Sequence, residues 1–257
     1  MLIDTHCHLT DAGLLGRLGE VLDHALAAGV DRMITVATSP DDWVAARSIV
    51  QRSEPLYMAA GLHPHKARQM AGGLIDRLAE VLRGPRVVAL GEVGLEYHYD
   101  FSPRDRQRQA FAEQLQLARR LDLPVVVHSR EAQADCLAVL DEQGMRDWHV
   151  VFHCFTGTAD EARQVLDRGW YLSFAGVVTF RNARDLQEAA KLVPVDRLLI
   201  ETDSPYLTPE PIRKLRPNEP GNLVHTAHCL AGLRGVGFED LAAACTANAE
   251  RFFRLGK

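Results

Sequence analysis

The sequence has too few cysteines, and too widely spaced, for a disulfide framework. It contains five, an odd number, and no Cys-x-x-Cys pair, so we expect reduced thiols and a cytoplasmic protein. No apolar run approaches the roughly 18 to 20 residues that cross a bilayer. No cationic stretch precedes an apolar one at the N-terminus, so we expect no signal peptide and no membrane partner.

An excess of positive charge is also missing. The chain has 29 Lys and Arg against 34 Asp and Glu, which gives a net charge of −5. Such a protein has no global field that would hold nucleic acid non-specifically. A nucleic-acid substrate would therefore have to be held by local cations and by metal ions. No feature of the sequence points to a protein partner.

What the 257 residues do contain is a repeated alternation of apolar, β-branched runs with amphipathic segments. We expect strands over residues 2–6, 32–37, 56–62, 87–93, 124–128, 149–153, 171–176 and 197–202, and helices over 13–28, 103–121, 131–143, 159–168 and 183–192. This pattern is typical of a parallel sheet covered on both faces. Eight units favour one α/β domain over residues 1–257, a (β/α)8 TIM barrel. An open doubly wound sheet is the alternative, but the glycine-rich phosphate loop that normally follows its first strand is absent.

Polar side chains gather where the predicted strands end. They are His6, His8, His63, His65, Glu92, His128, His153, Glu201 and Asp203. The carboxyl ends of the strands meet at one mouth of a barrel, where active sites of this fold lie. A lone histidine is usually an ordinary packed residue. Several imidazoles and carboxylates buried together would carry a heavy desolvation penalty, which coordination of a metal removes.

The first strand supplies two of these histidines. Side chains alternate between the faces of a strand, so Asp4, His6 and His8 are expected on one face and Cys7 on the other. Cys154 follows another candidate ligand, His153. We expect both cysteines to face the helix layer as small packed apolar groups.

The number of candidate ligands indicates more than one metal ion. His6, His8, Glu92, His128, His153 and Asp203 exceed one tetrahedral shell. We expect two divalent ions bridged by Glu92, and nitrogen and oxygen ligands without thiolate suit Mg²⁺, Mn²⁺ or Zn²⁺. Such a pair activates water for hydrolysis. Asp203 is the candidate general base, and Glu201 is its rival.

Six motifs together resemble those of TatD-type deoxyribonucleases, which belong to the amidohydrolase-like barrel hydrolases. They are "DTHCH", "GLHPH", "LGEVGLEYHYD", "PVVVHSR", "FHCFTG" and "LLIETDSPYLTP", and the resemblance runs from residue 1 to "NAERFF" at 248–253. It implies a divalent-metal phosphodiesterase that acts on DNA, often as a 3′→5′ exonuclease. Single-stranded or frayed ends are the substrate we expect.

The resemblance also implies roles for individual residues. His6 and His8 with Glu92 and Asp203 would hold one metal, Glu92, His128 and His153 the second, and His63 and His65 would line the site near the scissile phosphate. Glu96 departs from the family, which usually has aspartate there. The extra methylene keeps the charge but shifts the carboxylate, so its role stays open.

Four cations are candidates for substrate binding: Arg130, Arg213, Lys214 and Arg216. The last three lie in "PIRKLRPNEP", where the family usually has a run of basic residues. Arg130 can equally be an exposed or salt-bridged arginine, and the loop can equally be a solvated charge run. Phe174 and Phe180 can stack on bases, with core packing as the alternative. His24, His225 and His228 fall in helical segments and receive no role.

Three functions compete. The leading hypothesis is hydrolysis of DNA phosphodiester bonds by a metal-activated water. The same chemistry can attack an ester, a lactone, an amide or an aminoacyl-tRNA. A non-catalytic metal-binding barrel is the third possibility, but structural zinc sites are usually closed and rich in thiolates.

Overall fold

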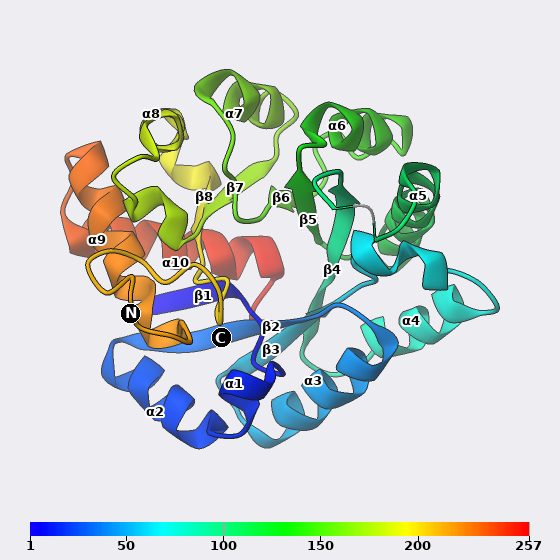
Figure 1. Cartoon of the computed structure of the whole chain (residues 1–257), viewed down its shortest axis with the longest axis horizontal. Coiled ribbons are helices and arrows are strands. Elements are labelled where there is room, and N and C mark those ends of the chain that lie inside the picture. Colours follow the sequence, from blue (N-terminus) through cyan, green and yellow to red (C-terminus); the bar gives the residue numbers. More distant parts are fainter. Residues whose placement is uncertain (100, 257) are drawn as a thin grey trace.

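Eight parallel strands form a nearly closed barrel with helices around it (Figure 1). The computed structural model describes residues 1–99 and 101–256. The strands, in spatial and chain order, are β1 (Leu2–Cys7), β2 (Val30–Ala37), β3 (Leu56–Ala60), β4 (Val87–Glu96), β5 (Val125–Arg130), β6 (Val150–Phe152), β7 (Tyr171–Phe174) and β8 (Leu198–Ile200). This confirms the barrel expected from the sequence.

The barrel closes beyond the end of β8. The Asp203 amide donates to the carbonyl of His6 at 2.9 Å, and the His8 amide donates to the carbonyl of Ser204 at 2.7 Å. Cys7 and Ser204 form an isolated parallel bridge. Because the closure uses residues after the last strand, it brings Asp203 directly beside the two histidines of β1.

Helices cover the outside of the barrel. They are α1 (Ala12–Leu15), α2 (Leu18–Ala27), α3 (Pro40–Arg52), α4 (Leu74–Leu82), α5 (Arg104–Leu121), α6 (Gln133–Glu142), α7 (Ala159–Leu166), α8 (Arg184–Leu192), α9 (Leu223–Arg234) and α10 (Phe238–Phe253). Short 3₁₀ helices are η1 (Pro64–Gln69), η2 (Gly176–Thr179), η3 (Val195–Arg197) and η4 (Pro220–Asn222). None of the described helices is both long and apolar enough to cross a membrane.

The structure differs from the sequence-based expectation in element bounds and in the additional helices α3, α4, α9 and α10. The helix predicted over 13–28 is divided into α1 and α2. The helix predicted from Pro103 begins at Arg104, and the preceding Ser102 does not cap it. Its hydroxyl instead donates to the carbonyl of His65 at 2.9 Å. That bond ties the loop after β4 to the segment after β3.

The core has two layers. The larger lies between the strands and the surrounding helices, and includes Leu2 and Cys7 of β1. The smaller fills the inside of the barrel and contains Ile3, Ile34, Val36, Ala59, Ala89, Val126, Val151, Tyr171 and Leu199. Phe252 and Phe253 of α10 belong to the same inner cluster. One end of the barrel is thus filled and covered by apolar side chains.

The first strand does not alternate regularly. Leu2 and Cys7 both belong to the outer layer although they are an odd number of residues apart, and the pairing of β1 with β2 shifts between Asp4 and Cys7. The expectation that Asp4, His6 and His8 share a face is therefore wrong for Asp4. Its carboxylate accepts hydrogen bonds from the Thr202 amide at 2.9 Å and the Thr202 hydroxyl at 2.5 Å. The irregularity turns both histidines toward the barrel mouth.

A close approach of β4 and β5 depends on Gly94. This residue has φ 140°, and a Cβ built on it would lie 2.0 Å from the carbonyl oxygen of His128. Only glycine tolerates both conditions. The approach places Glu92 and Glu96 of β4 within reach of the His128 ring.

Candidate metal centre at the barrel mouth

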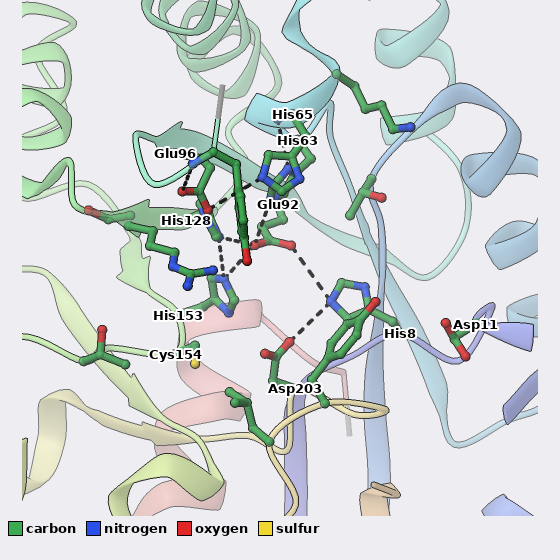
Figure 2. A pocket seen from close by; sticks show the side chains of 18 of the residues that line it. His8, Asp11, His63, His65, Glu92, Glu96, His128, His153, Cys154 and Asp203 are labelled. Carbon is green, nitrogen blue, oxygen red and sulfur yellow. Dashed lines mark hydrogen bonds and ion pairs between the residues drawn. The ribbon is translucent and has the colours of Figure 1, made fainter. Parts of the chain in front are cut away.

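The carboxyl ends of the strands surround a cavity of about 930 Å³. Seven of the nine polar residues expected at the strand ends line it: His8, His63, His65, Glu92, His128, His153 and Asp203 (Figure 2). His6 is completely buried just below them. Side chains from strands far apart in the sequence therefore converge on one space, as the positions at the strand ends predicted.

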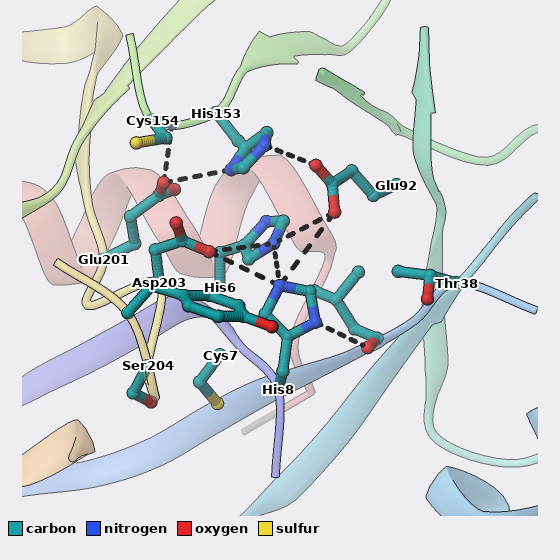
Figure 3. Close-up of polar contacts among 12 residues, drawn as sticks. His6, Cys7, His8, Thr38, Glu92, His153, Cys154, Glu201, Asp203 and Ser204 are labelled. Atoms are coloured by element: carbon teal, nitrogen blue, oxygen red, sulfur yellow. Dashed lines mark hydrogen bonds and ion pairs between the residues drawn. The ribbon is translucent and has the colours of Figure 1, made fainter. Parts of the chain in front are cut away.

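The first cluster joins β1 to the segment after β8 (Figure 3). The Nε2 atoms of His6 and His8 lie 3.3 Å apart. Oδ1 of Asp203 lies 3.4 Å from Nε2 of His8 and 3.9 Å from Nε2 of His6. Two ligands of one metal ion at about 2.1 Å lie about 3.0 to 3.4 Å from each other. The three atoms are therefore close to the spacing that a shared ion requires.

The pKa values of His8 and Asp203 in this cluster are set by burial and by the contacts between these two side chains. Burial lowers the pKa of His8, but the hydrogen bond and charge of Asp203 outweigh it and raise that pKa to about 9. Burial raises the pKa of Asp203, but its contacts with His8 and His6 bring that pKa below the ordinary value. The carboxylate is thus ionised at neutral pH. Nδ1 of His6 is buried without a hydrogen-bond partner among the described residues.

The second cluster surrounds Glu92. Oε1 of this carboxylate lies 2.7 Å from Nδ1 of His128, 2.7 Å from Nε2 of His153 and 3.5 Å from Nε2 of His63. Burial raises the pKa of Glu92, but the charge of His153 and the hydrogen bonds of His128 and His153 dominate and hold that pKa well below its usual range. Burial lowers the pKa of His63 to about 4.

Glu92 also connects the two clusters. While Oε1 faces the second cluster, Oε2 lies 3.6 Å from Nε2 of His6 and 4.0 Å from Nε2 of His8. Each oxygen of one carboxylate therefore faces a separate set of imidazoles. Imidazole nitrogens and carboxylate oxygens without thiolate are a donor set that divalent ions such as Zn²⁺ and Mn²⁺ accept. Three groups of residues in this region can hold an ion: His6, His8 and Asp203; His6, His153 and Glu201; and His63, Glu92 and His128.

Glu201 lies behind the cavity rather than in its wall. Its carboxylate accepts hydrogen bonds from the Cys154 amide at 2.6 Å and the Ser173 hydroxyl at 2.5 Å, and lies 3.2 Å from Nδ1 of His153. Asp203 follows in a left-handed conformation with φ 52°. This backbone turn explains why the two carboxylates, although two residues apart, do not face the same way.

Glu96 has a definite place in the site. Oε2 lies 3.2 Å from Nε2 of His128 and 3.7 Å from Nε2 of His65, and Oε1 accepts the His98 amide at 2.7 Å. Burial raises the pKa of Glu96, but these hydrogen bonds dominate and lower it to about 2. The longer side chain therefore still reaches the cavity. The role of Glu96, which the sequence left open, is thus to contact the rings of His128 and His65.

The expected cations divide into two groups. Arg130 lines the cavity, whereas Arg213, Lys214 and Arg216 are exposed on the segment between β8 and α9 and are not among its lining residues. The guanidinium of Arg213 lies 3.8 Å from the centroid of the Phe180 ring. Sequence reasoning missed Lys66, which lines the cavity from η1. It directly follows the "GLHPH" motif, and this position was the available signal.

Two further expectations concern buried and aromatic side chains. Cys7 is packed in the outer layer as expected, but the expectation for Cys154 is wrong because this residue lines the cavity. Its left-handed backbone, with φ 42°, ends the alternation of β6. Phe174 is fully buried, so it belongs to the core and does not stack on a substrate.

Comparison with known proteins agrees with this geometry. The family model of TatD related DNase matches residues 3–254. An uncharacterized metal-dependent hydrolase, YabD of Bacillus subtilis, is 40% identical over 99% of this chain and 100% of its own length. The 3′-5′ ssDNA/RNA exonuclease TatD of Citrobacter koseri is 36% identical over 99% of both chains.

Similarity extends to three dimensions. The crystal structure of YjjV, a TatD homologue from Escherichia coli, superposes with a TM-score of 0.93 at 30% identity, over 99% of this chain and 98% of that one. A match of the family model along nearly the whole length, together with relatives this similar, leaves one assignment. The chain belongs to the TatD related DNase family.

Proposed function

We propose that this TatD-family metal-dependent hydrolase cleaves phosphodiester bonds of nucleic acid, as a 3′→5′ exonuclease acting on DNA. The observation that carries the proposal is the position of Glu92, whose two oxygens face two separate clusters of imidazoles. A two-metal site would stabilise both the entering and the leaving oxygen of a displacement at phosphorus. The name of the Citrobacter koseri relative supports the exonuclease direction.

The two clusters define which residues would hold the ions. His6, His8 and Asp203 would hold one ion, His128 and His153 the other, and Glu92 would contact both. When bound, divalent ions supply Lewis-acid activation of water and neutralise charge that develops on phosphate oxygens. The site fits such ions because its nitrogen and oxygen atoms already converge at close to ligand spacing and because Nδ1 of His6 lacks a partner among the described residues.

The remaining side chains divide the other tasks. Asp203 is ionised and lines the cavity, so it is the group that accepts a proton from the attacking water. His63 is neutral because its pKa is about 4. It and His65 line the cavity and would contact a phosphate oxygen of the substrate. Glu201 does not reach the cavity; it orients His153 through Nδ1 and leaves Nε2 directed toward Glu92.

Cations at the cavity favour a phosphate-rich substrate. Lys66 and Arg130 line the same space as the two clusters, and they can neutralise backbone phosphates that flank the scissile one. An ester, lactone, amide or aminoacyl-tRNA would use the same catalytic groups. Its hydrolysis is therefore an outcome that the experiment must be able to detect.

The test is hydrolysis of a single-stranded oligodeoxynucleotide labelled at its 5′ end, with Mg²⁺, Mn²⁺ or Zn²⁺ added to metal-free protein. We expect a ladder of labelled products that shorten from the 3′ end, and no products with chelator. An ester and an aminoacyl-tRNA are assayed in parallel. Turnover of either of these without oligonucleotide cleavage would overturn the proposal, and binding of two ions without any turnover would indicate a non-catalytic barrel.

A further inference from the structure

Two aromatic rings at the edge of the cavity are left largely uncovered. Tyr99 and Phe101, between β4 and α5, expose 42% and 60% of their surface. Their rings are stacked, with centroids 5.4 Å apart and an interplanar angle of 28°, and Tyr99 lines the cavity. We call these two residues the aromatic shelf. Exposed apolar surface beside a polar cavity is typical of a binding surface.

The aromatic shelf is fixed to the catalytic centre rather than loosely attached. The amide of Tyr99 donates to Oε1 of Glu96 at 3.3 Å, and Glu96 also contacts the ring of His128. The ring of His65 stands edge-on to Phe101, with centroids 4.7 Å apart and an interplanar angle of 79°. A planar group resting on the shelf would therefore keep a defined position relative to the two clusters.

Positive charge accompanies the aromatic shelf. The guanidinium of Arg130 lies 5.0 Å from the centroid of the Tyr99 ring. Lys66 follows His65, and both cations line the cavity together with Tyr99. Aromatic faces combined with cations are the arrangement by which proteins bind single-stranded nucleic acid, because bases stack on the rings while phosphates contact the charges.

We propose that the aromatic shelf stacks on an unpaired nucleobase of the substrate, and that Lys66 and Arg130 contact the phosphates next to that base. The inference rests on the proposed function and assigns it a base-binding subsite. A base inside a duplex has both faces covered by its neighbours, so it cannot stack on the shelf. The subsite therefore selects single-stranded ends through base stacking and requires no particular sequence.

Binding to the metal-free protein tests the subsite independently of hydrolysis. Two fluorescent probes are compared by anisotropy in the presence of chelator: a single-stranded oligonucleotide, and the same phosphate backbone with abasic residues in place of nucleotides. For the double variant Tyr99→Leu/Phe101→Leu we expect Kd for the first probe to rise between about fivefold and about 150-fold. Kd for the abasic probe should change less than about twofold, because this probe carries no base that could stack.

Two further variants act as controls. Phe238→Leu removes a ring that stacks on His228 of α9 and does not line the cavity, and it should bind both probes as wild type does. Lys66→Gln/Arg130→Gln should weaken both probes alike and reduce the salt slope of binding by about 0.7 for each phosphate that the variant no longer neutralises.

The outcomes separate the subsite from the function. An equal rise in Kd for both probes in the shelf variant, or an unchanged Kd for the base-bearing probe, would overturn the subsite. Failure of the wild type to bind either probe would overturn it as well. Binding that depends on the shelf, without cleavage under any metal, would support the subsite and refute the nuclease. Cleavage by the shelf variant with an unaltered KM would support the nuclease and refute the subsite.

Discussion

The two ends of the barrel are built from the same eight strands, yet they differ in almost every physical property. At the amino end, apolar side chains such as Ile3, Val126 and Tyr171 fill the interior, and Phe252 and Phe253 of α10 pack with them. At the carboxyl end, the same strands present imidazoles and carboxylates around an open cavity. This difference shows that the apolar amino end contributes mainly to stability, whereas the carboxyl end holds the candidate metal centre. Variants at one end should therefore leave the other largely intact.

The largest effect is expected from Glu92→Gln, which keeps the side-chain volume and removes the charge shared by the two clusters. We expect the content of bound metal to fall below that of wild type, and kcat to fall by about a thousandfold or more. The fold should persist because the apolar layers are untouched. Metal analysis, kinetics and circular dichroism check this, and an unchanged metal content and rate would show that Glu92 is only a packed residue.

Phe252→Ala is expected to lower stability and to leave the metal centre intact. Phe252 is fully buried, and its ring packs against Tyr171 with centroids 5.0 Å apart. Truncation should lower the free energy of unfolding by about 3 to 5 kcal/mol, because it leaves a cavity in the inner core. Denaturant unfolding measures this decrease, and metal content per folded molecule should stay at the wild-type value. A variant that is stable but depleted of metal would contradict the claim that the two ends of the barrel act independently.

Metal affinity should depend on pH through His8. Its pKa is raised to about 9, so the metal-free protein carries a proton there at pH 7, and an imidazole must lose its proton to bind a metal. Affinity should therefore rise as pH increases from 7 to 9, about tenfold per unit for each proton released. Titration calorimetry in buffers of different ionisation enthalpy counts the protons. A constant affinity over this range would contradict the assignment.

The smallest effect is expected from neutralising the three exposed cations between β8 and α9. Arg213, Lys214 and Arg216 do not line the cavity, so we propose that they contact phosphates of nucleotides beyond it. Replacing all three with Gln should raise KM for a long oligonucleotide severalfold and reduce its salt slope by about 0.7 for each phosphate that is no longer neutralised. KM for a dinucleotide, which cannot extend that far, should not change. Equal effects on both substrates would mean that the segment shapes the cavity itself.

Prediction from the sequence succeeded for features that depend only on neighbouring residues in the chain. A run of β-branched residues predicts a strand, and eight such runs predict the barrel. The end of a strand can also be predicted, so most of the histidines and carboxylates at or near the ends of β1, β3, β4, β5, β6 and β8 could be placed at one mouth without knowledge of any contact. Strand periodicity carries this information without reference to the rest of the chain.

The sequence by itself thus determined the barrel and most of the side chains that meet at its mouth, because backbone propensity and period two act over a few neighbouring residues. Only the tertiary structure decided how each side chain points. The irregularity in β1 separates Asp4 from His6 and His8, because Asp4 bonds to Thr202 from the other end of the chain. Left-handed turns direct Asp203 and Cys154 into the mouth and leave Glu201 behind it. These orientations depend on hydrogen bonds between residues nearly two hundred positions apart in some cases, which no local pattern encodes.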